Sequence, residues 1–234
     1  MLFRVGIENN YEGRSIAWAL NHPGCFAYGA TGDQARQNLP AAIQGYIDWI
    51  AGHDPQPWLT AGTFEIQVEE TWEVFEIDED FELAEEGYEV NAWFRHDWKP
   101  LAEEEIERGL KMLHWSRADL LATVQDLKPD DLERRITGER WDITGILKHV
   151  GGAEWWYLDR LDLAFPREDA PEDPFERLEK VRAHMVIILP DLAGSRRVSG
   201  VDGEFWSPRK MLRRALWHER DHTEHIRKIL QLHH

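Results

Sequence analysis

The hydrophobic pattern changes its period near residue 100, and this change constrains the fold more than any other feature of the chain. Before it, segments such as 64–69 alternate apolar and polar residues, which is typical of half-buried strands. After it, apolar residues recur every three or four positions, which is typical of amphipathic helices. At 234 residues, the chain is long enough for two domains. We therefore predict one domain over residues 1–97 and a second over residues 98–234.

The first domain is predicted to be a small α+β unit. Segments 3–7 and 15–20 are expected to form a hairpin with its turn at residues 9–13. Thr31 can cap a helix that runs to about residue 50. Further strands are predicted at 64–69, 74–77 and 88–94.

The second domain is predicted to be an all-α antiparallel four-helix bundle. Helices are expected over 101–127, 142–163 and 174–192, and the last one starts where Ser207 can cap it and Pro208 suits its first position. Four helices of about 20 residues fit such a bundle. The segment 196–206 between the last two helices is expected to form a small hairpin about Asp202 and Gly203.

Composition narrows the function classes. No stretch approaches the ~18 consecutive apolar residues of a membrane span, and the first residues lack the pattern of a signal peptide, so a cytoplasmic location is expected. Cys25 is the only cysteine, which excludes an intrachain disulfide and a thiolate zinc site within one chain. The net charge is −17, and residues 1–97 hold four arginines and no lysine against 18 acidic residues. Neither half has the basic stripe that nucleic-acid binding requires, and no membrane contact is expected.

Histidines occupy positions of the last helix where apolar residues are expected. His218, His222 and His225 continue the inward-facing stripe of Met211 and Ala215, at spacings of three or four residues. Burying an imidazole without a partner costs about 1–3 kcal/mol, so the stripe requires either hydrogen-bond partners or a metal ion. The spacing alone does not decide between these two explanations.

His149 lies on the corresponding inward stripe of the second helix. Together with His218 and His222, it would place three imidazoles on one side of a cation and leave a coordination position open for water or substrate. A ligand set without thiolate suits zinc, nickel, iron or manganese. The alternative is that the three histidines are polar core groups with partners such as Glu154.

Two sequence segments carry a resemblance to a known family. In residues 141–154 a tryptophan opens the second helix and His149 follows two turns later. Residues 206–226 begin with Trp206-Ser207-Pro208 and contain the pair His218 and His222. Through these motifs, residues 101–231 resemble the DinB-like (YfiT-type) superfamily of four-helix metalloproteins.

This resemblance implies that His149, His218 and His222 bind a divalent metal. Several members of the superfamily use their metal to activate a low-molecular-weight thiol for S-transfer or isomerisation, while others are hydrolase-like or have no assigned reaction. The chain departs from the family at His225, where many members have glutamine. The substrate of such a member therefore cannot be assigned to this chain from the resemblance.

A second resemblance concerns residues 3–55, which are similar to HicB-like small α+β domains. It rests on the predicted hairpin followed by residues 21–31, which contain Pro23-Gly24, Cys25 and a second glycine before the helix. Because many such domains cover a partner protein, the resemblance implies a protein-binding or small-ligand role, including a homodimer or a protein partner through the N-terminal domain. Cys25 is expected to be a buried small apolar side chain.

Three further residues are candidates for the site. Glu219 and His225 are predicted to be catalytic, and Trp156 is predicted to wall a cofactor pocket. The simpler alternatives are a solvent-facing helix charge for Glu219, an interfacial histidine for His225 and a core aromatic for Trp156. The string from His218 to His222 also matches the H-E-x-x-H pattern of metalloproteases, but only twelve residues follow it, which leaves little room for a downstream ligand.

Two function hypotheses follow from these observations. The first is a metal-dependent enzyme that acts on a small molecule, by thiol S-transfer or by metal-assisted hydrolysis. The second is a non-catalytic partner-binding or stress-response protein with a metal-stabilised bundle.

Overall fold

The computed structural model describes residues 1–231, so the last three residues of the predicted second domain lie outside the described part. The chain divides into two compact units. Unit 1 comprises residues 1–99 together with 198–213, and unit 2 comprises residues 100–197 together with the chain from residue 214 onward. The structure thus has a sheet-containing N-terminal part and a helical C-terminal part, as predicted.

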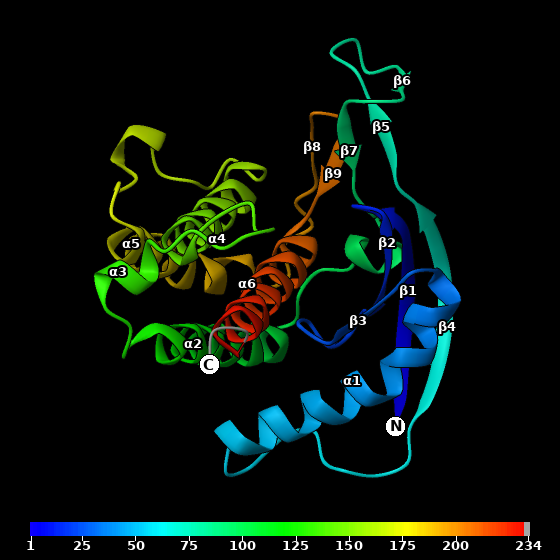
Figure 1. Cartoon of the computed structure of the whole chain (residues 1–234). Helices are drawn as coiled ribbons and strands as arrows, with labels where there is room; N and C mark the ends of the chain where they lie inside the picture. The colour runs from blue at the N-terminus through cyan, green and yellow to red at the C-terminus, as the bar shows by residue number, and fades with distance from the viewer. Residues whose placement is uncertain (232–234) are drawn as a thin grey trace. The chain divides into compact units, whose positions relative to one another are not determined.

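Unit 1 is built on a four-stranded sheet. Its strands are β1 (Leu2–Tyr11), β2 (Arg14–Ala19), β3 (Phe26–Gly29) and β4 (Glu65–Glu73), in the order β3-β2-β1-β4. The predicted hairpin pairs β1 with β2 in antiparallel register, whereas β1 and β4 run parallel (Figure 1). The parallel pair requires a long connection, and this connection contains α1 (Gly32–His53).

Helix α1 begins where the sequence predicts it. The Thr31 side chain accepts a hydrogen bond from the Gln34 amide at 3.3 Å, which caps the helix. The buried residues of α1 follow the helical period and form the apolar stripe of this helix: Ala35, Leu39, Ile43, Tyr46, Ile47 and Ile50. Cys25, in the loop before β3, is also buried, as predicted.

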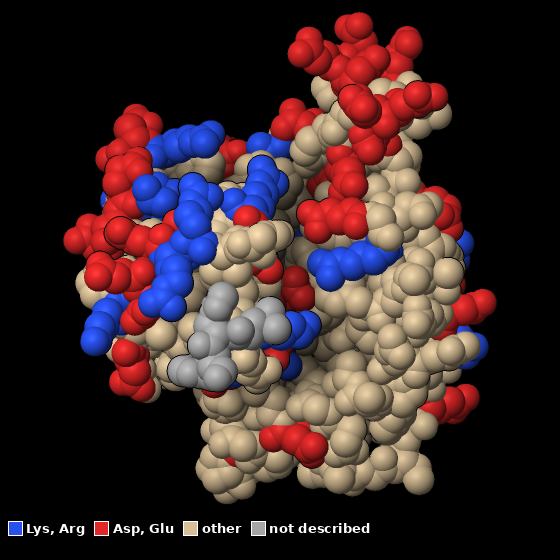
Figure 2. All heavy atoms as spheres, viewed as in Figure 1, with Lys and Arg blue, Asp and Glu red and all other residues tan. Residues whose placement is uncertain are grey.

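A second sheet of unit 1 and its connecting loops carry many acidic residues. It contains β5 (Phe75–Ile77), β6 (Leu83–Ala84) and β7 (Tyr88–Val90), in the order β6-β5-β7. Figure 2 shows red carboxylate side chains gathered where Figure 1 places β5 and β6. The exposed acidic residues here are Asp78, Glu79, Asp80, Glu82, Glu85 and Glu86. The strand predicted over 88–94 ends at Val90, and a short 3₁₀ turn, η1 (Arg95–Trp98), follows.

The hairpin β8 (Ser199–Val201) and β9 (Glu204–Trp206) forms about Asp202 and Gly203, as predicted. Both turn residues have positive φ, 50° and 78°, which the mirror-image turns of tight hairpins require. Within unit 1, Glu204 is buried and accepts hydrogen bonds from Asn91.

The helical part contains four long helices and several short elements. The long helices are α2 (Glu103–Val124), α4 (Ile143–Asp159), α5 (Pro174–Ile188) and α6 (Pro208–Gln231). Three of them are shorter than predicted, because turns and 3₁₀ segments take over their predicted ends. The short elements are α3 (Pro129–Leu132), η2 (Arg167–Asp169) and η3 (Leu189–Leu192). The antiparallel four-helix bundle stays a prediction, as do the family assignments of the two domains.

Two predicted helix starts are confirmed by their caps. The Asp142 side chain accepts a hydrogen bond from the Gly145 amide at 2.7 Å, and Ser207 Oγ accepts one from the Lys210 amide at 3.2 Å. Among the helices of residues 1–231, none combines the length and the apolar character that crossing a membrane requires.

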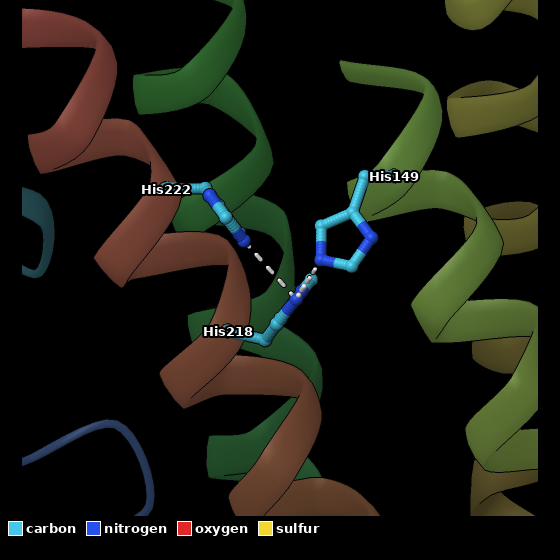
Figure 3. A group of neighbouring side chains, drawn as sticks. All are labelled: His149, His218 and His222. Atoms are coloured by element: carbon cyan, nitrogen blue, oxygen red, sulfur yellow. Dashed lines mark hydrogen bonds between the residues drawn. The ribbon is translucent and has the colours of Figure 1, made fainter. Parts of the chain in front are cut away.

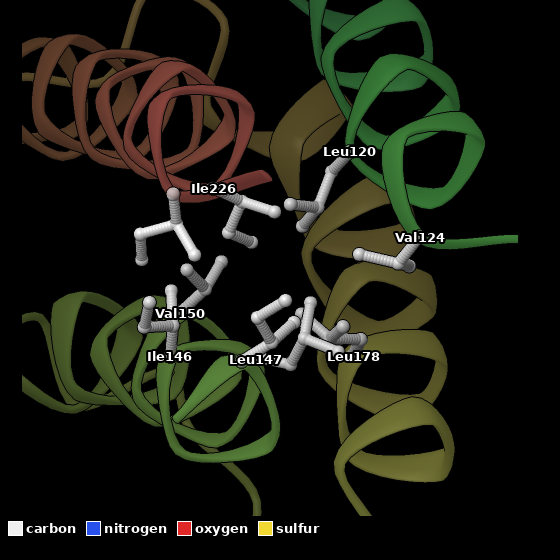
Figure 4. Close-up of a cluster of buried hydrophobic side chains, with 9 residues drawn as sticks. Leu120, Val124, Ile146, Leu147, Val150, Leu178 and Ile226 are labelled. Atoms are coloured by element: carbon white, nitrogen blue, oxygen red, sulfur yellow. The ribbon is translucent and has the colours of Figure 1, made fainter. Parts of the chain in front are cut away.

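All four long helices contribute to one apolar core of unit 2 (Figure 4). Leu120 of α2, Leu147 of α4, Leu178 of α5 and Ile226 of α6 are each at most 1% exposed. Burial of each such side chain stabilises the fold by about 1.5–3 kcal/mol. This core packs α4 against α6, the two helices that carry the predicted metal ligands.

Candidate metal centre

The three predicted ligands come together in the structure. His149 extends from α4, and His218 and His222 extend from successive turns of α6 (Figure 3). The Nε2 atom of His218 lies 2.9 Å from that of His149 and 3.2 Å from that of His222. One ring nitrogen from each of the three histidines lies within 4.8 Å of the others.

These distances suit a shared cation. Two imidazole nitrogens that are each about 2.0–2.1 Å from one tetrahedral ion lie about 3.3 Å apart. The observed separations of 2.9 and 3.2 Å are near this value, so small rotations of the rings would place all three nitrogens on one ion. Within residues 1–231, no carboxylate or thiolate joins the three imidazoles, which leaves a fourth position open, as is typical of catalytic rather than structural sites.

The surroundings favour neutral imidazole, which is the form that binds metals. Burial lowers the pKa of His149, and the positive charge of Arg140 lowers it further. Burial also holds the pKa of His218 well below its ordinary value, with added repulsion from His222, His149 and Arg214. At neutral pH, the lone pairs of His149 and His218 are therefore available.

Aromatic rings flank the cluster. The ring of Trp141 stacks on that of His149, with centroids 4.6 Å apart and an interplanar angle of 28°. Tyr157 meets His218 edge-on at 6.1 Å. The sequence analysis used Trp141 only as a motif residue that opens the helix. Its contact with His149 was missed because Trp141 precedes the helix cap and so lies outside the helical period.

His225 lies beside the cluster but does not belong to it. Its ring centroid is 6.1 Å from that of His222, and its Nε2 atom lies 2.8 Å from Glu139 Oε2. Glu139 is in the loop before α4, where no periodic pattern could have marked it. The catalytic role of His225 stays a prediction, and the structure adds a carboxylate that orients its ring.

Glu219 is not the solvent-facing charge of the simpler alternative. The residue is 1% exposed, and its two carboxylate oxygens accept hydrogen bonds from Arg117 and Arg182. Burial acts to raise the pKa of Glu219, but the two arginines outweigh it and lower the pKa. A carboxylate held in this way is a weak base, so the geometry does not favour the predicted catalytic role or the H-E-x-x-H interpretation, which requires the glutamate as a base.

Trp156 is half-buried on α4. Its ring lies 5.6 Å from that of Tyr157, and the guanidinium of Arg160 lies 4.7 Å above it. Tyr157 also contacts His218, so the ring of Tyr157 lies between Trp156 and the cluster. Its role in cofactor binding stays a prediction.

Two other histidines lie elsewhere in unit 2. His114 is exposed on α2, and His184 Nε2 lies 2.8 Å from the carbonyl oxygen of Leu163. Neither belongs to the three-histidine cluster.

Comparison with protein families gives one match. Residues 109–191 are similar to the family described as mycothiol-S-transferase (MST), which supports the DinB-like resemblance. The matched segment is roughly a third of the chain and contains His149, whereas His218 and His222 lie beyond it. The match does not include residues 3–55, so the HicB-like resemblance stays a prediction. No curated protein and no solved structure matched the chain. A segment similar to thiol S-transferases and a three-histidine cluster suited to a divalent metal are thus combined in one unit.

Proposed function

We propose that the chain is a metal-dependent transferase that joins a low-molecular-weight thiol to a small electrophilic molecule. The observation that carries this proposal is the convergence of the Nε2 atoms of His149, His218 and His222 from two helices. The similarity of residues 109–191 to mycothiol S-transferases supports thiol chemistry, and mycothiol is the first thiol to test.

In this proposal His149, His218 and His222 hold the cation as neutral ligands. A bound divalent cation would act as a Lewis acid and lower the pKa of a thiol placed at its open position. Trp141 would hold the ring of His149 in place by stacking and keep water from one side of the cluster.

The remaining step needs a proton acceptor. As the new sulfur–carbon bond forms, the leaving group departs with its bonding electrons, and the thiol proton must pass to a base. His225 is our candidate, because Glu139 orients its ring at 2.8 Å and would stabilise the imidazolium that results.

The experiment has two parts. Elemental analysis of the purified protein and of His149→Ala measures the bound metal. The wild-type protein is then incubated with mycothiol or glutathione and a panel of alkyl halides and epoxides, with and without chelator, and adducts are measured by mass spectrometry. We expect adduct formation that the chelator and His149→Ala abolish and that the exposed control His114→Ala leaves unchanged. A metal-loaded protein that is inert toward the whole panel would contradict the proposal, and activity toward esters instead would favour metal-assisted hydrolysis.

One observation favours the second candidate, a partner-binding role of the N-terminal unit. Phe81 and Leu83 are 63% and 79% exposed within the acidic segment of β5 to β7. Exposed apolar side chains rimmed by charge often mark protein interfaces. Light scattering of the wild type and of Phe81→Ser/Leu83→Ser tests a homodimer through this segment. A wild-type monomer would count against it.

A further inference from the structure

Four charged side chains in unit 2 are buried together, one from each long helix. They are Arg117 of α2, Glu154 of α4, Arg182 of α5 and Glu219 of α6. The exposed fractions of these side chains are 10%, 4%, 9% and 2%, respectively. We call this set the Arg–Glu ring.

Each carboxylate oxygen of the ring accepts one bond from a guanidinium group. Arg117 donates to Glu219 Oε1 at 2.6 Å and to Glu154 Oε2 at 2.8 Å. Arg182 donates to Glu154 Oε1 at 2.5 Å and to Glu219 Oε2 at 2.9 Å. The ring is therefore closed, and its two positive and two negative charges balance.

The two arginines also bind backbone carbonyl groups of each other's helices. Arg117 on α2 donates to the carbonyl oxygen of Leu178 on α5, and Arg182 on α5 donates to that of Leu113 on α2. A rotation or a slide of α4 or α6 would break two ion pairs at once, because Glu154 and Glu219 each bind both arginines. Guanidinium suits this role because its planar fork fixes direction as well as distance.

Two members of the ring lie on the helices that carry the ligands. Glu219 directly follows His218 on α6, and Glu154 is five residues beyond His149 on α4. Desolvation makes a buried ion network a weak source of net stability compared with apolar packing, whereas such networks can fix helix register. The ring joins the helices that carry the ligands, and the rotation of α4 and α6 determines where the imidazoles point. A change in the register of these helices would therefore move the imidazoles directly.

We propose that Glu219 and Glu154, held by Arg117 and Arg182, are positioning residues that set the rotation of α6 and α4 so that His149, His218 and His222 converge on one ion. This inference rests on the proposed metal site. It assigns Glu219 a role through its neighbours, in place of direct action on a substrate.

The test compares two buried glutamates. Glu219→Gln places amide N–H groups against a guanidinium and breaks the ring. Glu204→Gln is the matched control, because Glu204 is equally buried and is paired with Lys210 at 3.4 Å, but belongs to unit 1. Zinc affinity is measured by competition with a chromophoric chelator, the absorption spectrum of the cobalt-loaded protein reports ligand geometry, and urea unfolding of the metal-free protein reports stability.

We expect Glu219→Gln to weaken zinc binding about 10-fold or more, which is the usual effect of losing a group that orients metal ligands, and to change the cobalt spectrum. Glu204→Gln should lower the urea midpoint and leave affinity and spectrum at wild-type values. Wild-type affinity and spectrum in Glu219→Gln, with only a lowered urea midpoint, would overturn the inference.

A second variant keeps the test decisive if Glu219→Gln does not fold. Arg182→Lys keeps the positive charge, but one ammonium cannot reproduce the forked contacts to Glu154, Glu219 and the Leu113 carbonyl group. The same loss of zinc affinity is expected, and unchanged affinity would overturn the inference. A wild-type protein that binds neither zinc nor cobalt would instead overturn the proposed function, and the inference with it.

Discussion

His149 and His218 are 69 residues apart in the chain, yet their Nε2 atoms lie 2.9 Å apart. Burial lowers the pKa of each of these imidazoles, so both rings are held neutral and carry no charge that would oppose a cation. Two neutral imidazoles at this distance can share a hydrogen bond in the metal-free protein and can bind one cation together when metal is present, so the consequences of the arrangement can be measured.

The metal content should depend on the ligand histidines. We expect His149→Ala and His218→Ala to lower bound metal from about one equivalent to less than a tenth, because two imidazoles retain a divalent ion poorly at neutral pH. Elemental analysis after gel filtration measures this. His114→Ala, which removes an exposed histidine of α2, should retain the wild-type content, and full occupancy in both ligand variants would exclude this site.

The metal-free protein should lose stability as the pH falls below about 6.5, the ordinary histidine pKa. The folded state keeps His218 neutral because its pKa is lowered, while the unfolded state takes up a proton, so acid favours unfolding. For a fully shifted group, the loss is up to about 1.4 kcal/mol per pH unit. Urea unfolding of chelator-treated protein between pH 8 and pH 5 should show a steeper decline for the wild type than for His218→Gln. Equal slopes would show that His218 does not contribute.

Trp141 should support the site through its stack on His149. Removing the ring in Trp141→Ala should weaken zinc binding about 2- to 10-fold, the equivalent of the 0.5–1.5 kcal/mol typical of aromatic pairs. Trp141→Phe should restore most of the affinity because it retains a stacking face. Trp98→Ala removes a tryptophan of unit 1 that is 54% exposed and should have no effect on zinc binding. The three affinities can be compared by chelator competition.

A cavity in the apolar core of unit 2 should lower the free energy of unfolding. Leu120 is fully buried in the cluster of Figure 4, so Leu120→Ala should lower the free energy of unfolding by about 2–5 kcal/mol. The adjacent Leu121 is 39% exposed, and Leu121→Ala should cost less than about 1 kcal/mol. Urea midpoints of the two variants give the comparison. Similar losses would mean that the described packing of α2 is wrong.

The site was predictable from the sequence because its residues violate a strong pattern. A histidine at an apolar position of a helix stands out, and this signal marked His149, His218, His222 and also His225. The spacing alone did not show a metal site, and the family resemblance selected the first three residues, which the structure brings together. Helix starts were predictable for a similar local reason, since Asp142 and Ser207 cap the amides that follow them.

The Arg–Glu ring was not predictable in the same way. Charged residues on a helix are usually solvated, and no spacing links Arg117 to Glu154 and Glu219 on other helices. The parallel pairing of β1 with β4 was equally hidden, because strand partners distant in sequence leave no local periodicity. Strand β3 was missed because it is short and follows the Pro23-Gly24 turn.

The membership of α6 in both units limits how this protein can be dissected. Its first residues, up to Arg213, belong to unit 1, where the buried guanidinium of Arg213 binds Asp97 at 2.8 Å. A shortened chain beginning at residue 98 would keep Arg213 and Glu204 but discard their partners Asp97 and Asn91. Such a fragment would also lose Trp18 and Phe94, whose rings lie against the Arg213 guanidinium near the start of the helix that supplies two of the three histidines. Poor metal binding by the isolated half would therefore say little about the intact protein.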